Sequence, residues 1–369
     1  MSCRRITSLL LVTMVFASNV VASAAAERWI HPKCKLLETK HLGPFINLPD
    51  GSILTADEDA AWISRDDGKT WSLQGKILEG RGQTFGKGTR NRLLLRTNKG
   101  TIVLVYMDLS SQKFKWDEKN QRPEGEVTLN VWSARSEDDG KTWTDFTMVL
   151  KGYCGSMFDI LQTRDGRIVV PLHFILPYDP DHSGISSYAS DDDGRMWKQS
   201  NVIDLGGRGH HDGALEPTAI ELKDGRLWML IRTNWDKFWE AFSEDQGHTW
   251  RTIRPTSIDA SSAPAHLIRL ASGRLVMAWN RLYPEGQTSY RRMSLPFSEE
   301  SGCWNREELS IAFSDDDGKT WSKPVVIVRQ KGAWLSYPHL FEVRPGELWL
   351  TLRFSGLKLK LCEEDFVGE

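Results

Sequence analysis

The chain has 369 residues, of which 26% are charged, and its formal net charge is −2 at pH 7. This near balance gives no electrostatic attraction to nucleic acid or to an anionic membrane surface, so we expect neither as a partner. After the first 26 residues no apolar stretch is long enough to span a bilayer.

The N-terminal segment has the pattern of a secretory signal. Two arginines precede the apolar run Leu9–Ala17, and the small residues Ala22–Ala26 provide a cleavage site. We therefore expect residues 1–26 to be a signal peptide and residues 27–369 to form a single domain. The mature protein would then be secreted or periplasmic.

An eight-residue word recurs five times along the mature chain. Its first copy reads SRDDGKTW, and a serine, an aspartate, a glycine and a tryptophan return at the same offsets in every copy. The aspartate can accept hydrogen bonds from the following amides, the glycine can adopt a positive φ, and the tryptophan can pack beside the turn. The repeat therefore predicts a turn between two strands, in an architecture built several times over. The five copies are Ser64–Trp71, Ser136–Trp143, Ser190–Trp197, Ser243–Trp250 and Ser314–Trp321.

A second repeat, out of step with the first, marks hairpin turns. Each of its glycines lies between two strand-like segments, as Gly225 does between Thr218–Leu222 and Arg226–Ile231. Six such hairpins alternate with five tryptophan turns. We therefore expect six four-stranded blades, each with the hairpin first and the tryptophan turn between its third and fourth strands. The six glycines are Gly51, Gly100, Gly166, Gly225, Gly273 and Gly346.

The last blade begins near Ser336 and runs out of chain after three strands. We expect its fourth strand to come from Trp29–Leu37, which would close the ring and remove an exposed edge. The predicted fold is thus an all-β, six-bladed β-propeller with five Asp-box turns, closed by the N-terminal strand joining the last blade. The mature chain has an even number of cysteines, and the predicted secretion would take it through an oxidising compartment. The closure predicts that Cys34 and Cys362 lie close enough for a disulfide.

This topology assigns the hairpin glycines and the tryptophan turns to one face of the disc, and the functional site to the opposite face. Long loops mark a functional face, and the longest here are Asp108–Glu126 and Arg281–Arg306. The residues on that face are unusually polar, and charges near the ring axis are costly unless they pair or meet a ligand. They are Asp57, Arg92, Asp108, His173, His210, His211, Asp212, Glu216, Arg232, Arg281, Arg306 and Tyr337.

Three segments follow a recognisable order along the chain. Glu216-Pro217-Thr218 leads through a hairpin to Arg232, Arg306 precedes the fifth tryptophan turn, and Ser336-Tyr337-Pro338 begins the last blade. In these segments the chain resembles the sialidase (neuraminidase) superfamily, which includes secreted Asp-box (BNR repeat) proteins with a six-bladed propeller. The resemblance covers most of the mature chain.

The resemblance implies a retaining exo-glycosidase that hydrolyses a terminal sialic acid, or a related acidic sugar, from a glycan without a cofactor. It implies Tyr337 as the nucleophile, Glu216 as its base, and Arg232 and Arg306 as fork-shaped ligands of the sugar carboxylate. A tyrosine suits this substrate because it is neutral until it is deprotonated, whereas a carboxylate nucleophile would be repelled by the sugar's own charge.

Blade one departs from the family pattern. Its first strand, His41–Asn47, has no arginine where the family carries its first one. Arg92 begins the first strand of blade two instead, and we expect it to reach the substrate from there. For the acid that protonates the leaving oxygen we favour Asp57. Asp59, Asp108 and Asp117 are the alternatives.

The loop that leads into blade four carries adjacent polar residues. Neighbouring side chains on an extended segment point to opposite sides, which suits metal chelation poorly, so we predict no metal site. We expect His211 and Asp212 to hydrogen-bond sugar hydroxyls. Two other hypotheses use the same residues: a propeller that binds acidic glycans without catalysis, and an enzyme that acts on a different acidic sugar by hydrolysis or elimination.

Overall fold

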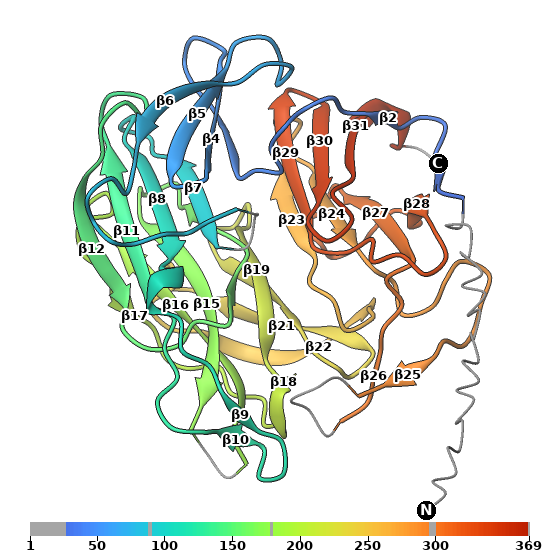
Figure 1. Ribbon diagram of the computed structural model, residues 1–369. Helices are drawn as coiled ribbons and strands as arrows, with labels where there is room; N and C mark the ends of the chain where they lie inside the picture. Colours follow the sequence, from blue (N-terminus) through green and yellow to red (C-terminus); the bar gives the residue numbers. More distant parts are fainter. Residues whose placement is uncertain (1–26, 88–90, 178–179, 295–299, 368–369) are drawn as a thin grey trace, which may run out of the picture.

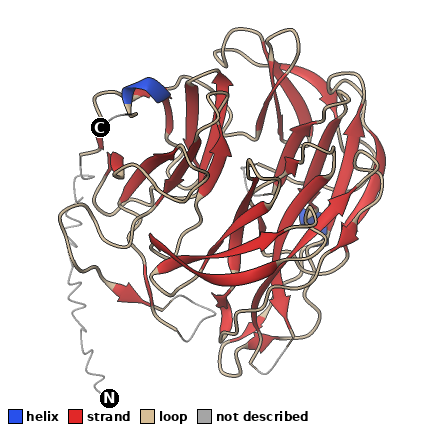
Figure 2. Cartoon of the chain, turned by 180° about the vertical axis from the view of Figure 1, so that it is seen from behind, coloured by secondary structure: helices blue, strands red, loops and turns tan. Residues whose placement is uncertain are grey.

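The computed structural model describes residues 27–87, 91–177, 180–294 and 300–367, so the expected signal peptide lies outside the described residues. Within these ranges the regular structure is almost entirely β-strand (Figure 2). The two short 3-10 helices are η1 (Leu109–Ser111) and η2 (Glu363–Asp365). Six sheets, with mainly antiparallel strand pairing, stand around a ring (Figure 1), which confirms the predicted all-β, six-bladed propeller. No helix in the described ranges is both long and apolar enough to cross a membrane.

The first three blades follow the chain in order. Blade one contains β3 (Phe45–Asn47), β4 (Ile53–Asp57), β5 (Ala60–Ser64) and β6 (Ser72–Lys76). Blade two contains β7 (Arg92–Arg96), β8 (Ile102–Met107), β11 (Val131–Ser136) and β12 (Thr144–Leu150). Blade three has a split first strand, and it contains β13 (Ser156–Met157), β14 (Leu161–Gln162), β15 (Ile168–Leu176), β16 (His182–Ser190), β17 (Lys198–Gln199) and β18 (Gly209–Gly213).

The last three blades complete the ring, and the N-terminal strands join two of them. Blade four contains β19 (Leu215–Glu221), β20 (Leu227–Arg232), β21 (Lys237–Ser243) and β22 (Arg251–Asp259). Blade five contains β23 (His266–Arg269), β24 (Leu275–Trp279), β27 (Glu308–Ser314), β28 (Val325–Arg329) and β1 (Trp29–Ile30). Blade six contains β29 (Pro338–Arg344), β30 (Glu347–Leu352), β31 (Lys358–Cys362) and β2 (Lys35–Leu36).

The two predicted long loops each carry a small two-stranded insert. The loop of blade two forms β9 (Trp116–Asp117) and β10 (Arg122–Pro123), and the loop of blade five forms β25 (Arg292–Met293) and β26 (Gly302–Cys303). Both inserts project from the lower part of the ring in Figure 1. At most of the junctions between blades the two first strands contact one another, so these strands form the inner wall of the ring.

The N-terminal segment closes the ring as predicted, because β2 pairs antiparallel with β31. Lys35 lies opposite Lys360, and Leu36 lies opposite Leu359. The preceding strand, β1, instead extends blade five by pairing with β28. One short segment therefore fastens two blades, which protects both outer edges.

The predicted disulfide between Cys34 and Cys362 is wrong. All four cysteines of the described chain are free. Cys34 is buried in the apolar cluster between blades five and six, and Leu361 belongs to the same cluster. Leu361 and Cys362 are neighbours on β31, so their side chains point to opposite faces of the sheet. Cys362 therefore faces away from Cys34.

The tryptophan turns have the predicted hydrogen bonds. In the first copy, Asp66 Oδ1 accepts from the Thr70 amide at 2.9 Å, and Asp66 Oδ2 accepts from the Thr70 hydroxyl at 2.6 Å. Gly68 has a φ of +78°, and a Cβ there would lie 2.6 Å from a ring carbon of Trp349 in blade six. Only glycine allows this approach to the neighbouring blade. The repeat therefore fastens blades to each other as well as closing turns.

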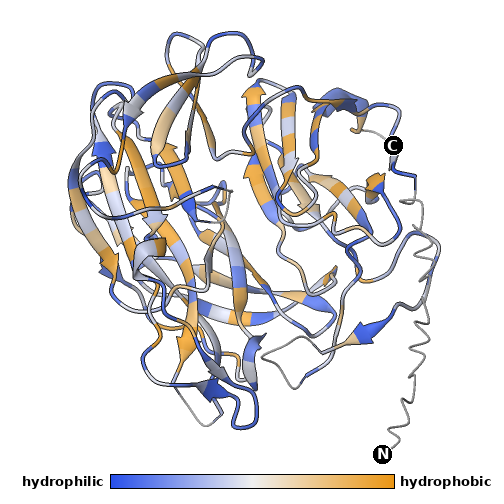
Figure 3. Cartoon of the chain, in the orientation of Figure 1, coloured by the Kyte–Doolittle hydropathy of each residue, from blue (hydrophilic) through white to orange (hydrophobic). Residues whose placement is uncertain are grey.

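Apolar clusters fill the space between neighbouring blades. Between blades one and two, for example, Leu54 and Ala61 pack with Leu104 and Ala134, and all four have no solvent exposure. In Figure 3 the apolar residues follow the strands, while the turns and loops are mainly hydrophilic. Burial of this apolar surface is the main stabilising contribution, and it leaves the loop ends free to carry polar side chains.

Candidate functional site

Three predicted site residues from two blades meet on the face opposite the tryptophan turns. Tyr337 directly precedes β29, Glu216 is the second residue of β19, and Arg232 ends β20. The Tyr337 hydroxyl donates a hydrogen bond to Glu216 Oε1 at 2.8 Å. Arg232 Nη1 lies 3.3 Å from the same hydroxyl and pairs with Glu216 Oε2. The structure therefore brings together the expected nucleophile, its base and one of the arginines.

The backbone is strained at two of these residues. Glu216 has a φ of 34° and Tyr337 a φ of 61°, values that residues other than glycine rarely adopt. The pairing of β19 with β20 also changes register between Leu215 and Thr218. Such conformations cost about 1–3 kcal/mol each and cluster at functional sites. Here the strain aims a phenol and a carboxylate at the same point.

The charge states of the pair suit proton transfer. Burial alone would raise the pKa of Glu216, but the charge of Arg232 and the hydrogen bonds from Arg232 and Tyr337 hold it below its ordinary value. Burial and the charge of Glu216 raise the pKa of Tyr337. At neutral pH a protonated phenol therefore donates to an ionised carboxylate. This is the arrangement that a general base needs to activate a hydroxyl.

Arg306, two residues before β27, is a buried cation that faces aromatic rings. Only 2% of Arg306 is exposed. Its Cζ lies 4.4 Å from the ring centroid of Trp304, 4.7 Å from that of Trp334 and 5.3 Å from that of Tyr337. Its Nη2 donates to the Ser262 carbonyl at 2.7 Å, and its Nε lacks an acceptor. Burial lowers its pKa to about 10, so it keeps its charge at neutral pH.

The charges around Tyr337 do not balance. Glu216 neutralises Arg232, whereas no carboxylate of the described residues forms an ion pair with Arg306. A buried charge without a partner is costly, and a ligand carrying a carboxylate would supply that partner. The site therefore contains one buried cation whose charge the described residues do not balance.

A cavity of about 110 Å³ opens beside Tyr337 and Glu216. Its opposite wall contains Tyr153, His173 and His210. The Tyr153 hydroxyl lies 3.0 Å from His210 Nε2. Burial lowers the pKa of His173 to about 4, so this ring is neutral. This wall therefore offers neutral hydrogen-bonding groups opposite the arginine side. The residues lining the cavity are Asn91, Met107, Leu109, Gln112, Leu129, Tyr153, Gly155, His173, His210, His211, Leu215, Glu216, Arg232 and Tyr337.

The long loop of blade two covers this wall, as its length predicted. The rings of Phe114 and Trp116 pack edge-on against His210, with centroids 5.1 and 5.8 Å away. Leu109 and Gln112 from the same loop line the cavity. The loop therefore closes the blade-two side of the site.

Arg92 and Asp57 form a separate cluster with each other. Arg92 Nη2 lies 2.5 Å from Asp57 Oδ1, and Asp57 Oδ2 lies 2.8 Å from His41 Nδ1. Neither Arg92 nor Asp57 lines the cavity beside Tyr337. Burial alone would raise the pKa of Asp57, but His41 and Arg92 hold it below its ordinary value. An ionised Asp57 has no proton to give to a leaving group at neutral pH.

The alternative acids each stabilise a loop. Asp59 accepts from the Phe85 amide at 2.8 Å and from the Thr84 hydroxyl at 2.6 Å. Asp108 caps η1. Asp117 accepts from two backbone amides within the turn between β9 and β10. None of these three carboxylates lines the cavity.

The structure separates the two residues expected to bind sugar hydroxyls. His211 lines the cavity. Asp212 is buried in its own loop, where its carboxylate accepts from the amides of Arg208 and Gly213, both at 2.9 Å. Asp212 therefore supports the loop that carries His211.

Several residues of the site were not predicted as candidates. Tyr153 follows the last strand of blade two, and the same blade counting that placed Tyr337 could have identified it. Ser262 supports both arginines, because its hydroxyl accepts from Arg232 Nη2 at 2.9 Å and its carbonyl accepts from Arg306. It lies in the linker between blades four and five, where neither repeat marks a position.

A larger groove, of about 800 Å³, lies beside the fifth tryptophan turn, between blades four and five. Two of its arginines are paired within the protein. Arg226 lies 2.8 Å from Asp224, and Arg254 lies 2.6 Å from Glu240. The smaller cavity at Tyr337 is the better candidate, because Tyr337, Glu216 and Arg232 line it together. Arg306 does not line it, but its guanidinium lies 5.3 Å from the Tyr337 ring centroid.

Comparison with known proteins gives a consistent result. The family model of the BNR repeat-like domain matches residues 55–350. The sialidase of Micromonospora viridifaciens is 26% identical over 299 residues, which are 77% of this chain and 43% of that protein. The sialidase of Clostridium perfringens is 26% identical over 239 residues, which are 56% of this chain and 59% of that protein. The chain thus spans about half the length of these curated relatives.

Solved structures show the same fold. The Hadza microbial sialidase Hz136 superposes with a TM-score of 0.60 at 18% sequence identity. The match covers 89% of this chain and 66% of that one. The likeness supports the six-bladed architecture.

Proposed function

The chain belongs to the BNR repeat-like family of the sialidase superfamily, and on that premise we propose that it is a retaining exo-glycosidase that releases a terminal sialic acid from a glycan. The observation that carries this proposal is Arg306, a buried cation without a carboxylate partner in the described chain, beside the Tyr337–Glu216 pair. Sialic acid bears a carboxylate on its anomeric carbon. Binding of that carboxylate by Arg306 and Arg232 would bring the reacting carbon to Tyr337.

In the proposed reaction, Tyr337 Oη attacks the anomeric carbon while its proton passes to Glu216. The bond from that carbon to the leaving oxygen breaks, and the leaving oxygen takes a proton from an acid or from water. Water then attacks the same anomeric carbon and gives one proton to the conjugate base of that acid. The bond from the carbon to Tyr337 Oη breaks, Glu216 returns its proton to the phenolate, and the sugar leaves with retained configuration. Arg232 stabilises the charge that develops on Tyr337 Oη.

One observation favours a second candidate function, the binding of acidic glycans without their cleavage. The expected acid, Asp57, is ion-paired with Arg92 and lies outside the cavity lining. A sugar leaving group needs a proton, whereas an aryl leaving group departs without one. Slow cleavage of natural glycans together with cleavage of aryl glycosides would follow from this arrangement.

The test compares the wild-type protein with Tyr337→Phe on aryl sialosides, sialyllactose and uronic-acid oligosaccharides. The proposal expects wild-type release of sialic acid and a loss of at least about 1,000-fold in Tyr337→Phe, because the nucleophile is gone. Tyr188→Phe is the matched control, since Tyr188 is buried in the core between blades two and three. Undiminished turnover in Tyr337→Phe would rule out the mechanism. Saturable binding without any product would establish the second function instead, and release from uronic-acid substrates alone would move the activity to another acidic sugar.

A further inference from the structure

The first strand of blade three is interrupted beside the strand that carries Glu216. Its two pieces, β13 and β14, both pair with β15, and residues 158–160 lie between them outside that ladder. Both pieces contact β19, which is the edge strand of blade four. The interruption allows two residues, Phe158 and Asp159, to contact the neighbouring blades.

Asp159 holds β19 just beyond Glu216. One of its carboxylate oxygens, Oδ2, accepts from the Thr218 hydroxyl at 2.7 Å and from the Ala219 amide at 3.0 Å. The Thr218 hydroxyl in turn accepts from the Leu267 amide of blade five at 3.2 Å. One carboxylate therefore links the inner strands of blades three, four and five.

The backbone around Glu216 lacks other support at this point. Glu216 has a positive φ of 34°, and the next residue, Pro217, has no N–H with which to hold the strand. The pairing of β19 with β20 is out of register between Leu215 and Thr218. Thr218 is thus the first residue after Glu216 that is back in register, and Asp159 bonds to it.

The same segment of blade three contacts the other member of the reacting pair. The ring centroid of Phe158 lies 5.3 Å from that of Tyr337. Burial raises the pKa of Asp159 to about 6, and hydrogen bonds alone oppose that effect. At neutral pH the protein therefore keeps an ionised carboxylate at a cost in stability. Features that cost stability are expected at functional sites.

We propose that Asp159 is a positioning residue, which acts through Thr218 and Ala219 to hold Glu216 in the conformation that accepts the proton of Tyr337. This inference rests on the proposed function, because it assigns a further residue to the same reaction. Asp159 does not line the cavity, so it acts through Glu216 and not on the substrate.

The experiment measures kcat and KM separately for an aryl sialoside, whose leaving group needs no proton. Asp159→Leu removes the acceptor, and kcat should fall roughly 10- to 100-fold because the base is misplaced. KM should stay within about twofold, since Arg306 still binds the sugar carboxylate. Asp159→Asn keeps an oxygen that can accept both hydrogen bonds, so its kcat should stay within about threefold of wild type.

The matched control is Glu221→Leu, at the other end of β19. Glu221 also links blades three and four, because its carboxylate accepts from the Arg164 amide at 2.8 Å and lies 3.0 Å from Arg164 Nε. It lies on the face of the hairpin glycines, opposite the site. Its loss should therefore leave kcat within about twofold of wild type.

Equal losses of kcat in Asp159→Leu and Glu221→Leu would overturn the inference, because any contact between blades three and four would then have the same effect. An Asp159→Asn variant as slow as Asp159→Leu would also overturn it. If Asp159→Leu does not fold, Thr218→Val replaces it, and this variant should lower kcat without a change in KM.

A wild-type protein that cleaves no sialoside would remove the proposed function instead. The crystal structure of Asp159→Leu then judges the positioning on its own. A Glu216 that has turned away from Tyr337 supports the role of Asp159, and a Glu216 that keeps its hydrogen bond to Tyr337 overturns it.

Discussion

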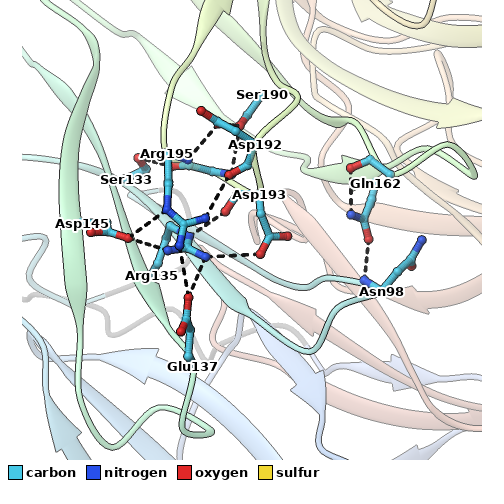
Figure 4. A network of polar contacts seen from close by, with 12 residues as sticks. Asn98, Ser133, Arg135, Glu137, Asp145, Gln162, Ser190, Asp192, Asp193 and Arg195 are labelled. Atoms are coloured by element: carbon cyan, nitrogen blue, oxygen red, sulfur yellow. Dashed lines mark hydrogen bonds and ion pairs between the residues drawn. The ribbon is translucent and has the colours of Figure 1, made fainter.

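Two buried arginines lie near opposite ends of the third strands of blades two and five, and their surroundings differ. Arg135, in β11 beside a tryptophan turn, is 1% exposed and contacts three carboxylates (Figure 4). It pairs with Asp145, with Glu137 at 3.0 Å and with Asp193 at 3.3 Å. Arg306, before β27 on the other face, is 2% exposed and has one carbonyl acceptor and three aromatic neighbours.

The difference separates a charge that is paired within the protein from one that is not. Burial alone would lower the pKa of Arg135, but hydrogen bonds with Asp145, Asp193 and Glu137 raise it above its ordinary value. At Arg306 the contributions of Tyr337 and Glu216 do not offset the effect of burial, and the pKa falls to about 10. The charge of Arg135 is balanced by carboxylates of the protein itself, and the side chain links blade two to the turn of blade three. The guanidinium of Arg306 has no carboxylate partner among the described residues, and the proposed substrate carries a carboxylate.

The largest expected effect is on activity, in Arg306→Met. Removing one partner of a buried charge pair costs about 2–5 kcal/mol, so kcat/KM for a sialoside should fall by about 30- to 4,000-fold. The free energy of unfolding should stay the same or rise, because a buried cation without an ionic partner is removed. Steady-state kinetics and urea unfolding measure the two quantities. A stability loss with full activity would contradict the functional assignment of Arg306.

The matched substitution on the other face, Arg135→Met, should have the opposite pattern. It leaves Asp193 buried without its cation, and we expect the free energy of unfolding to fall by about 3 kcal/mol. The kcat/KM of the folded fraction should stay within about twofold of wild type, since Arg135 lies on the face opposite the site. If Arg135→Met reduced kcat/KM more than Arg306→Met did, the contrast between the two arginines would be lost.

A smaller expected effect is on the pH dependence of kcat/KM, which should depend on Glu216 and not on Arg135. The folded pKa of Glu216 is held below its ordinary value, so its base form is present at neutral pH and is lost as the pH falls through that depressed pKa. We expect kcat/KM to be level near neutrality and to fall about tenfold per pH unit only below about pH 4. Arg135→Met should keep this profile. A decline that begins near pH 6 would exclude Glu216 as the base.

The fold was predictable because the turns that end its strands are encoded by short local motifs. Each hairpin glycine and each tryptophan turn fixes a strand end, and the blade count follows. Tyr337, Glu216 and Arg232 were predictable for the same reason, since each lies within a residue of a strand end. Their strained φ values and their mutual hydrogen bonds were not, because these depend on packing between blades.

The predictions that the structure did not follow concern contacts between side chains, which the sequence repeats do not encode. Arg92 and Asp57 lie at strand ends as expected, yet they pair with each other across blades one and two. The Cys34–Cys362 disulfide failed on the alternation of side chains along β31, which a closure argument alone does not resolve. The rings around Arg306 come from Trp304 and Trp334 in loops that carry neither repeat.

The most direct test of the central claim is calorimetric titration of Tyr337→Phe with the methyl α-sialoside and with its carboxyl methyl ester, which differ only in the anionic charge. If the sugar carboxylate forms an ion pair with Arg306, the ester should bind about 100-fold more weakly than the acid. That difference should shrink to within about threefold when Arg306→Met is added, because the protein then lacks the cation that pairs with the sugar carboxylate. Equal binding of acid and ester by Tyr337→Phe would contradict the claim.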